Sequence, residues 1–546
     1  MVTRDPSDAN RIFAGSPSGG LWKSLNGGTT WEPLTDEFSA MGISGIVIDH
    51  TDPNTIYVST GDGDGADTYS IGVMKSTDGG QTWATTGMTH TIGQSIVSRK
   101  LLMHPTNEQI LFVCTNDGLF KTTDAGANWT LVQSGSMRDV EFKPGDPSTV
   151  YTCSDEFFKS TDGGETFNQV FGGLPTASSV NRISIAVSPD EPNWIYLLAG
   201  DQSDASFLGL YKSQDSGASF SLLTDTPNMF GYAEDGSTGG GQSWYDMALA
   251  VNPTNADIVV LGGINVWRSS DGGNNFTISS HWVYPPTVGY THADIHTLDY
   301  FGNDLFCGSD GGLFISTDNG ISYTDLSFGM EITQFYRFGG SLQNANLIIA
   351  GSQDNGSNLW DGTNWTHVMG ADGMEGAINP TNANVIFCTF QFGGLRRTLD
   401  GGANWSDIST GSGEDGSWVT PYESLPGNKL IIAYENVWLS NDNGDTFNPI
   451  SNFSNGSAND LDVCKGDHNH IAVSFDEELY LTQDGGSTWN LISTGLPNNF
   501  ITDIHFHPTD PELIYVTLSG FDASEKVYVT RDAGTTWFNI SNNLPN

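Results

Sequence analysis

Basic residues are scarce in this sequence. Its 546 residues include 20 Lys and Arg against 64 Asp and Glu, which gives a formal net charge of −44. Nucleic acids and anionic membranes bind proteins through basic surface, so this composition argues against both partners. The acidity fits a solvated surface in a saline habitat, or a protein that binds divalent cations.

Long apolar runs and cysteine pairs are also missing. No apolar run approaches the roughly 18 residues of a membrane-spanning helix, so we expect no membrane insertion. The five cysteines include no Cys-x-x-Cys spacing, and Cys114, Cys153, Cys307 and Cys388 all stand near the end of a predicted second strand. We expect these four to be small buried apolar side chains rather than disulfide partners.

What the sequence does contain is a short phrase, repeated about a dozen times. Its form is Ser/Thr-x-Asp-x-Gly-x-Thr/Ser/Asn-aromatic, and residues 76–83 are the cleanest copy. Further copies occupy 122–129, 160–167, 213–220, 269–276, 316–323, 398–405, 440–447, 482–489 and 530–537, with variants at 24–31 and 361–365. The closing aromatics recur roughly every 46 residues, a period that indicates a repeat array.

Each repeat carries the strands of one propeller blade. The Asp and Gly of the phrase make a tight turn, because the Asp side chain accepts backbone N–H groups and Gly adopts positive φ. In the last repeat, apolar runs at 501–505, 513–518 and 527–530 are followed by 537–540, which makes four strands. We therefore predict an all-β fold of tandem β-propellers, built from about twelve four-stranded blades.

Twelve blades around one ring would leave a very wide hole, so we expect two rings. The predicted first propeller covers residues 1–330 with about seven blades, and the second covers 331–546 with about five. The first predicted strand, at 1–6, is short. The final phrase, at 544–546, resembles the phrase that precedes another blade at 496–498. Both features favour a trimmed chain, cut from a longer protein with further blades.

The phrase resembles the Asp-box of the sialidase and sortilin-type propeller families. The whole chain resembles two groups of tandem propellers with Asp-boxes: the family-74 endo-xyloglucanases, and the sortilin-like repeat proteins that Bacteroidetes secrete, often by the type IX route. Residues 61–77, 292–296 and 351–356 are similar to the second group. The resemblance implies a secreted or cell-surface protein, although no signal peptide is visible in this chain.

The family-74 resemblance implies two catalytic Asp residues, one on each ring, that act as acid and base in an inverting hydrolysis. Where the first is expected, Pro17 stands in its place within residues 15–20. Asp354 is the nearest match to the second, and Asp62 or Asp64 could substitute for the first. Because proline carries no transferable proton, the sequence leans against catalysis.

Sialidase and acyl-transfer activity are less favoured still. A sialidase needs three arginines that converge on the substrate carboxylate, whereas this chain has ten arginines, no Arg-Ile-Pro phrase before its repeats, and a net charge that would repel sialic acid. The Gly-x-Ser-x-Gly elbow of an acyl-transfer nucleophile is absent from the sequence as well.

Two sets of residues outside the repeat are candidate metal ligands, and no other cofactor is expected. Asp62, Asp64 and Asp67 alternate in an acidic loop that could hold Ca²⁺, although a flexible acidic loop is the favoured interpretation. His292, Asp294 and His296 alternate along a predicted inner strand, which would place them on one side as transition-metal ligands. A hydrogen-bonded cluster is favoured there, because such ligands on one strand seldom converge on one ion.

Aromatic residues with polar neighbours mark the candidate ligand-binding face. Rings for stacking and carboxylates for hydroxyl groups describe a carbohydrate platform, while protein contacts or packing between the two rings are the alternatives. The candidate binding residues are Tyr69, Trp244, Tyr245, Trp282, Tyr284, Tyr290, Gln353 and Asp372.

Three functions remain open at this point. The preferred hypothesis is a secreted or cell-surface module that binds a polysaccharide or an extracellular protein at this face, between the rings. The second is a glycoside hydrolase on β-glucan or xyloglucan-type chains, with Asp354 and a carboxylate from residues 62–67 as its pair. The third is a structural component of an extracellular assembly.

Overall fold

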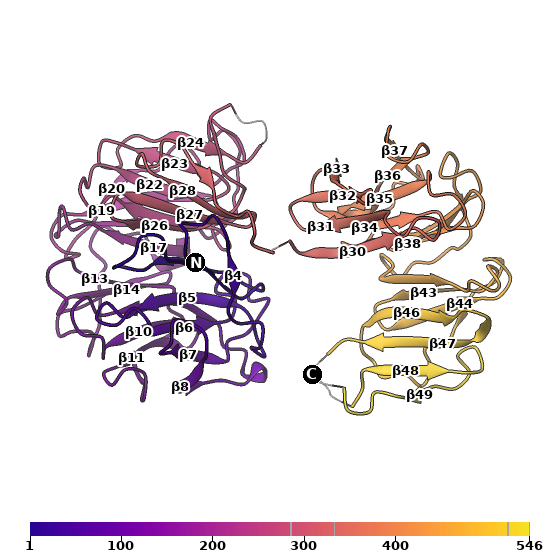
Figure 1. Ribbon diagram of the computed structural model, residues 1–546, viewed down its shortest axis with the longest axis horizontal. Helices are drawn as coiled ribbons and strands as arrows, with labels where there is room; N and C mark the ends of the chain where they lie inside the picture. The colour runs from indigo at the N-terminus through magenta and orange to yellow at the C-terminus, as the bar shows by residue number, and fades with distance from the viewer. Residues whose placement is uncertain (284–286, 332, 521–523, 545–546) are drawn as a thin grey trace. The chain divides into compact units, whose positions relative to one another are not determined.

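The computed structural model describes residues 1–283, 287–331, 333–520 and 524–544 (Figure 1). The chain forms two compact units, Met1–Ile332 and Thr333–Asn546. Nearly all of the regular structure is β-strand, and the strands of each sheet follow one another in chain order. The predicted all-β class is confirmed.

Seven sheets make up the described part of the first unit. Their strands are β1 (Val2–Arg4), β2 (Ile12–Gly15), β3 (Leu21–Ser24), β4 (Glu32–Pro33); β5 (Ile43–Ile48), β6 (Ile56–Thr60), β7 (Gly72–Ser76), β8 (Ala84–Thr89); β9 (Ser98–Met103), β10 (Leu111–Thr115), β11 (Gly118–Thr122), β12 (Thr130–Ser134); β13 (Asp139–Phe142), β14 (Val150–Cys153), β15 (Phe157–Ser160), β16 (Asn168–Gln169); β17 (Val180–Val187), β18 (Ile195–Asp201), β19 (Phe207–Ser213), β20 (Ser221–Thr224); β21 (Ala248–Val251), β22 (Val259–Gly262), β23 (Val266–Ser269), β24 (Thr277–His281), β25 (Gly289–Tyr290); β26 (Ile295–Phe301), β27 (Asp304–Ser309), β28 (Gly312–Ser316) and β29 (Thr324–Asp325).

Five sheets make up the described part of the second unit. Their strands are β30 (Phe335–Gly340), β31 (Ile348–Ser352), β32 (Gly356–Trp360), β33 (Trp365–Met369); β34 (Gly373–Ile378), β35 (Ile386–Phe390), β36 (Gly394–Thr398), β37 (Ser406–Ile408); β38 (Tyr422–Leu425), β39 (Lys429–Ala433), β40 (Val437–Ser440), β41 (Asn448–Pro449); β42 (Asp460–Val463), β43 (Ile471–Phe475), β44 (Glu478–Thr482), β45 (Asn490–Leu491); β46 (Ile501–His507), β47 (Asp510–Leu518), β48 (Val527–Thr530) and β49 (Phe538–Asn539).

The sheets are the predicted propeller blades. Neighbouring strands pair antiparallel, as in β6 and β7, where Val58 lies opposite Met74. The first strands of successive sheets, such as β5 and β9 or β42 and β46, lie against each other, so they form the inner side of each unit. One sheet departs from four strands, because β25 adds to β24 in parallel.

The repeated phrase forms the predicted turn. The Ser76 hydroxyl donates to Asp78 at 2.8 Å and accepts the Gly80 amide at 2.8 Å, while Asp78 Oδ1 accepts the Thr82 amide at 2.9 Å. Gly80 has a φ of +91°, and the Trp83 indole N–H donates to its carbonyl oxygen. Hydrogen bonds from Thr82 and Ser76 lower the pKa of Asp78 to about 2. The Asp is committed to the turn, which supports a structural role.

Apolar residues fill the spaces between adjacent blades. The first unit closes on itself, since Val2 and Ile12 of the first sheet share a cluster with Phe306 and Leu313 of the seventh. The Trp31 indole N–H also donates to the Leu326 carbonyl oxygen at 2.9 Å. These contacts join the beginning of the first unit to its end.

The cysteine prediction is confirmed, because all five cysteines are buried and free. Cys114, Cys153, Cys307 and Cys388 each lie on the second strand of a sheet, as expected. The helical elements in the described ranges are three short 3₁₀ turns, η1 (Ile92–Gln94), η2 (Ala177–Ser179) and η3 (Gln391–Gly393), so none of them is long or apolar enough to cross a membrane.

Candidate functional site

The acidic loop that follows β6 is ordered by its own carboxylates. Asp62 is buried, and its two oxygens accept the amides of Asp64 at 2.9 Å and Asp67 at 3.1 Å. Asp67 is exposed, and its carboxylate accepts no hydrogen bond from the described residues. Burial, followed by the charges of Asp62 and Asp310, raises the pKa of Asp67. Tyr69 lies half-buried at the end of this loop.

The side chain of Asp64 contacts two residues that are distant in the sequence. Its Oδ1 lies 2.8 Å from Arg182 Nη1 on β17, and its Oδ2 lies 3.0 Å from His296 Nδ1 on β26. Burial alone would raise the pKa of Asp64, but Arg182 and the hydrogen bond with His296 outweigh it and hold the pKa well below its usual range. Asp64 is therefore an ionised, fully engaged carboxylate.

His296 forms a bridge between two carboxylates. Its Nε2 lies 2.7 Å from Asp310 Oδ1, and the Tyr245 hydroxyl donates to the other oxygen of Asp310 at 2.8 Å. Burial opposes the imidazolium, yet the hydrogen bonds with Asp310 and Asp64 raise the pKa of His296 well above its usual value. The Tyr245 ring stands edge-on to the imidazole, with 4.7 Å between centroids. The structure thus brings together Asp64, Tyr245 and His296, which the sequence analysis had assigned to three different sites.

The predicted alternation of His292, Asp294 and His296 along one strand is wrong. β26 begins only at Ile295, and Asp294 adopts a left-handed backbone with a φ of +63°. His292 lies outside the strand, and the Asp294 carboxylate accepts a hydrogen bond from Gln242. Burial, then the charge of Asp310, raises the pKa of Asp294 to about 6. The left-handed turn breaks the period of two on which the prediction depended.

No metal centre is evident in the part of the chain that the structure describes. Within those residues, no three His, Cys, Asp or Glu side chains are grouped so that they could hold an ion. Asp62 is occupied by amides of its own loop, and Asp64 by Arg182 and His296. Neither trio that the sequence singled out forms a set of converging ligands.

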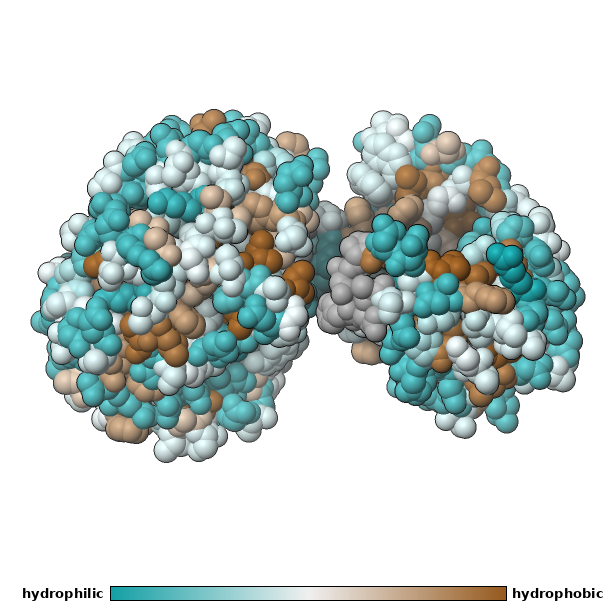
Figure 2. Space-filling view, turned by 90° about the horizontal axis from the view of Figure 1, so that it is seen from below, coloured by the Kyte–Doolittle hydropathy of each residue, from teal (hydrophilic) through white to brown (hydrophobic). Residues whose placement is uncertain are grey.

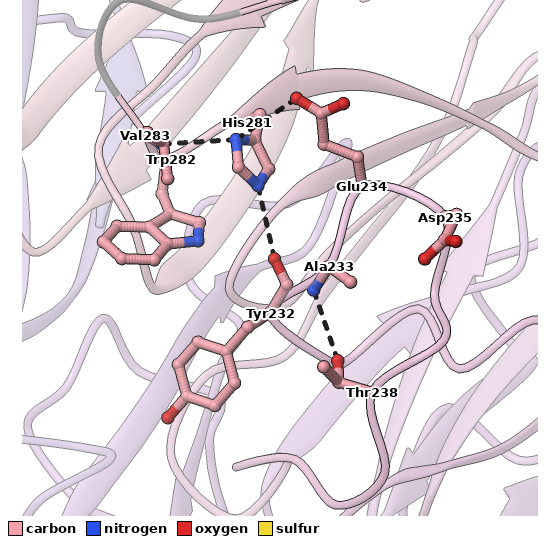
Figure 3. Close-up of a pocket in the computed structure, with 8 residues that line it drawn as sticks. All are labelled: Tyr232, Ala233, Glu234, Asp235, Thr238, His281, Trp282 and Val283. Atoms are coloured by element: carbon pink, nitrogen blue, oxygen red, sulfur yellow. Dashed lines mark hydrogen bonds and ion pairs between the residues drawn. The ribbon is translucent and has the colours of Figure 1, made fainter.

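A separate pocket of about 530 Å³ lies between the segment 232–238 and the end of β24 (Figure 3). Tyr232 and Trp282 form its aromatic walls, with rings edge-to-face and centroids 6.4 Å apart. Both are exposed, at 55% and 41%. Glu234 and Asp235 supply carboxylates at its rim (Figure 3). Exposed rings beside carboxylates are the chemistry expected of a sugar-binding surface.

Buried polar groups hold the two walls of this pocket. The Asn265 side chain donates to the Gly231 carbonyl oxygen at 3.2 Å and accepts the Trp282 amide at 3.2 Å. His281 Nε2 lies 3.3 Å from the Tyr232 carbonyl oxygen, which can only accept, so this nitrogen carries a proton (Figure 3). The walls are positioned by the fold.

The other predicted aromatics divide between surface and core. Trp244 is 50% exposed, and its ring lies 5.4 Å from that of Tyr245. Tyr290 instead packs against the cluster between the sixth and seventh sheets, with its ring 6.1 Å from Phe314. Tyr290 is thus a packing residue in this structure. Tyr284 lies outside the described residues.

In the second unit, Asp354 and Asp372 lie next to each other. The turn between β31 and β32 contains Gln353 and Asp354, and Asp354 has a left-handed φ of +56°. The Asp354 amide donates to Asp372 Oδ1 at 2.6 Å, and the other oxygen of Asp372 accepts from the side chain of Gln391. The amide of Gln353 donates to the Gln334 carbonyl oxygen at 3.0 Å.

An aromatic group that was not among the predicted site residues lies beside these residues. Phe392 follows Gln391, is 56% exposed, and stands edge-on to Trp418, which is 45% exposed. The Trp418 indole N–H donates to the Tyr336 hydroxyl at 3.2 Å. The phrase Gln-Phe-Gly-Gly at 391–394, which interrupts the repeat, is the signal that could have revealed it.

A family model described as sortilin, neurotensin receptor 3, matches residues 19–148 and 435–546, one segment in each unit. The xyloglucanase Xgh74A of Acetivibrio thermocellus is 25% identical over 343 residues, which are 54% of this chain and 40% of that protein. A xyloglucanase of Hypocrea jecorina is 22% identical over 552 residues, which are 89% of this chain and 59% of that protein. The chain thus spans less than two thirds of either relative.

Among solved structures, the GH74 enzyme of Niastella koreensis superposes with a TM-score of 0.65 and 17% identity, covering 99% of this chain and 84% of that one. This likeness concerns the fold. The resemblance that the repeats implied is confirmed: the chain is an all-β tandem propeller with Asp-boxes, similar to the sortilin type and to family-74 xyloglucanases.

Proposed function

We propose that this protein hydrolyses a polysaccharide of the β-glucan or xyloglucan type. The observation that carries the proposal is the similarity to a xyloglucanase along 89% of this chain. It reverses the preference of the sequence analysis, in which hydrolysis was an alternative to binding alone. A polysaccharide of this kind lies outside the cell, so the proposal includes a secreted or cell-surface location.

The proposal names Asp67 of the first unit and Asp354 of the second as candidate catalytic carboxylates, each tested by its own variant. Of the three aspartates in the acidic loop, Asp62 and Asp64 are engaged by other groups, whereas Asp67 is exposed and its pKa is raised. A carboxyl group with a raised pKa is suited to donate a proton to the leaving oxygen. Asp354 is the nearest match to the second catalytic Asp of family 74.

Release of reducing ends from xyloglucan and mixed-linkage β-glucan tests the proposal. We expect Asp67→Asn and Asp354→Asn each to lower kcat by about a hundredfold or more, because general acid–base catalysis contributes on that order. Asp36→Asn removes an exposed carboxylate elsewhere in the first unit and should leave kcat unchanged. Wild-type release that persists in both variants would refute the assignment, and no release from any substrate would refute hydrolysis.

Binding without hydrolysis is the second candidate, favoured by Pro17 in the place of the first catalytic Asp. Its site would be the aromatic pocket of Tyr232 and Trp282. Affinity electrophoresis in xyloglucan gels tests it: wild type should be retarded, and Trp282→Ala should lose roughly 1 kcal/mol or more of binding free energy from the missing ring. Phe171→Ala, an exposed ring on another loop, serves as the control. Equal retardation of wild type and Trp282→Ala would exclude this pocket.

A further inference from the structure

Three arginines gather on the inner side of the first unit. Arg99 lies on β9, Arg138 directly precedes β13, and Arg182 lies on β17, so consecutive blades each contribute one. A total of ten arginines and a net charge of −44 argue, from composition alone, against three converging arginines. Since first strands of neighbouring blades lie against each other, the fold concentrates these cations locally.

The three guanidinium groups, here called the arginine cluster, lack sufficient partners. Arg138 forms no side-chain hydrogen bond or ion pair with the described residues, and its Nη1 is buried, as are the unpartnered Nε atoms of Arg99 and Arg182. Burial, then the charges of Arg182 and Arg99, lowers the pKa of Arg138 to about 9. The Arg138 side chain as a whole is half-buried, and a partly desolvated cation without an ion pair is unfavourable, a cost that a bound anion would offset.

One carboxylate of the chain already occupies part of the cluster. Asp64 pairs with Arg182 at 2.8 Å, and it forms the one ion pair recorded for the three arginines among the described residues. The acidic loop also packs closely on β9, since a Cβ atom on Gly63 would lie 3.1 Å from Arg99 Cα. Arg99 donates instead to Ser136 Oγ at 2.7 Å and to the Met137 carbonyl oxygen. The Asp64 charge also acts on Arg138, but no ion pair joins the two, so the Arg138 guanidinium can still pair with a second carboxylate.

Aromatic surface adjoins the cluster. Arg182 Nη1 donates to the Tyr245 carbonyl oxygen at 2.9 Å, and the neighbouring Trp244 is half exposed. Exposed indole rings stack on the apolar faces of sugars, whereas guanidinium groups bind carboxylates. Together they match a sugar that carries a carboxylate better than a neutral sugar or a free anion.

We propose that the arginine cluster binds the carboxylate of an acidic saccharide, with Arg138 as its principal contact and Trp244 as the stacking surface. Asp64 acts as a competing internal carboxylate that holds Arg182. The proposal goes beyond hydrolysis of a neutral glucan and does not depend on it, because it concerns binding by other residues.

Isothermal titration calorimetry with an oligomer of galacturonic acid, and with a neutral galactose oligomer of equal length, tests the proposal. We expect the acidic oligomer to bind wild type at least about tenfold more tightly than the neutral one. Arg138→Gln should weaken acidic binding about tenfold or more, and Asp64→Asn should strengthen it several-fold, roughly, by freeing Arg182. Arg531→Gln, at an exposed arginine of the second unit, should change nothing.

The outcomes distinguish the alternatives. Equal affinity for both oligomers would overturn the proposal, as would an Arg138→Gln variant that binds like wild type. A lower affinity in Asp64→Asn would show that this carboxylate organises the cluster rather than competing for it. Arg138→Lys keeps the charge but not the bidentate geometry and should retain part of the affinity, which separates a local effect from misfolding. Loss of hydrolysis in the Asp67 and Asp354 variants has no bearing on these measurements.

Discussion

The inner strands of the two units differ in their charged residues. Basic and acidic side chains are mixed in the first unit, where Lys100 pairs with Asp139 and Glu141, whereas acidic side chains predominate in the second. In the first unit, these strands bring together the arginine cluster and His296. In the second, Arg337 on β30 lies 3.3 Å from Glu375 on β34 and 3.5 Å from Asp460 on β42, with Glu423 and Asp462 beside them. The same type of blade therefore accommodates different charged residues on its inner strand, because other residues form the Asp-box turn.

The units also differ in how their ends are covered. The first and last sheets of the first unit share an apolar cluster. Within the described residues of the second unit, apolar clusters join consecutive sheets but none joins β30 to the last sheet. Phe335 and Phe338 on β30 are 48% and 72% exposed, and hydrophobic residues are visible along a hollow of this unit (Figure 2). Whether the first strand of a unit, β1 or β30, is covered therefore depends on contact between the first and last sheets rather than on the sequence of the blade.

The largest expected effect separates the closed unit from the open one. Phe306→Ala removes a fully buried ring from the closing cluster and should lower the free energy of unfolding by about 3–5 kcal/mol. Phe338→Ala removes an exposed ring and should change it by about 0.5 kcal/mol or less. Urea unfolding followed by fluorescence measures both. Similar losses would mean that Phe338 is buried in solution.

Glu375 in the second unit should contribute a pH dependence to stability. Burial raises the pKa of Glu375 to about 7, although Arg337 and its hydrogen bond oppose the shift. The folded state then binds more protons than the unfolded state between the usual value of 4.5 and this pKa, so stability falls as the pH rises through that window, by up to about 3 kcal/mol.

Unfolding of wild type and Glu375→Gln from pH 4 to pH 8, roughly the range of these two pKa values, measures this effect. The variant cannot titrate at this position and should lose the corresponding part of the slope. Asp36→Asn, which removes an exposed carboxylate of the first unit, should keep the wild-type slope. A slope that Glu375→Gln leaves intact would contradict the expectation.

The smallest effect compares two arginines. Arg337→Gln leaves Glu375 and Asp460 without their counter-charge and should cost about 1–2 kcal/mol, since the pair is only partly buried. Arg138→Gln relieves repulsion among like charges and should cost nothing, within about 0.5 kcal/mol. Thermal unfolding of both variants tests the difference. An equal loss in Arg138→Gln would reveal a stabilising contact of Arg138.

The sequence by itself determined the blades. The hydrogen bonds of the Asp-box turn join residues two to four positions apart, as from Ser76 to Asp78 and from Asp78 to Thr82, so the turn can be deduced from local chemistry. The period of the phrase then predicts the number of sheets, and buried cysteines follow from their places on second strands. Local hydrogen bonds and periodic apolar positions can be predicted from the order of residues in the sequence alone.

Only the tertiary structure decided the sites. Asp64 and His296 are in contact although 232 positions separate them in the sequence, and no motif spacing predicts that contact. The packing of Tyr290 and the pairing of Phe392 with Trp418 likewise depend on neighbouring blades. A ring of blades brings distant first strands together, so the charge of an inner surface is set by which strands become neighbours rather than by the composition of the chain.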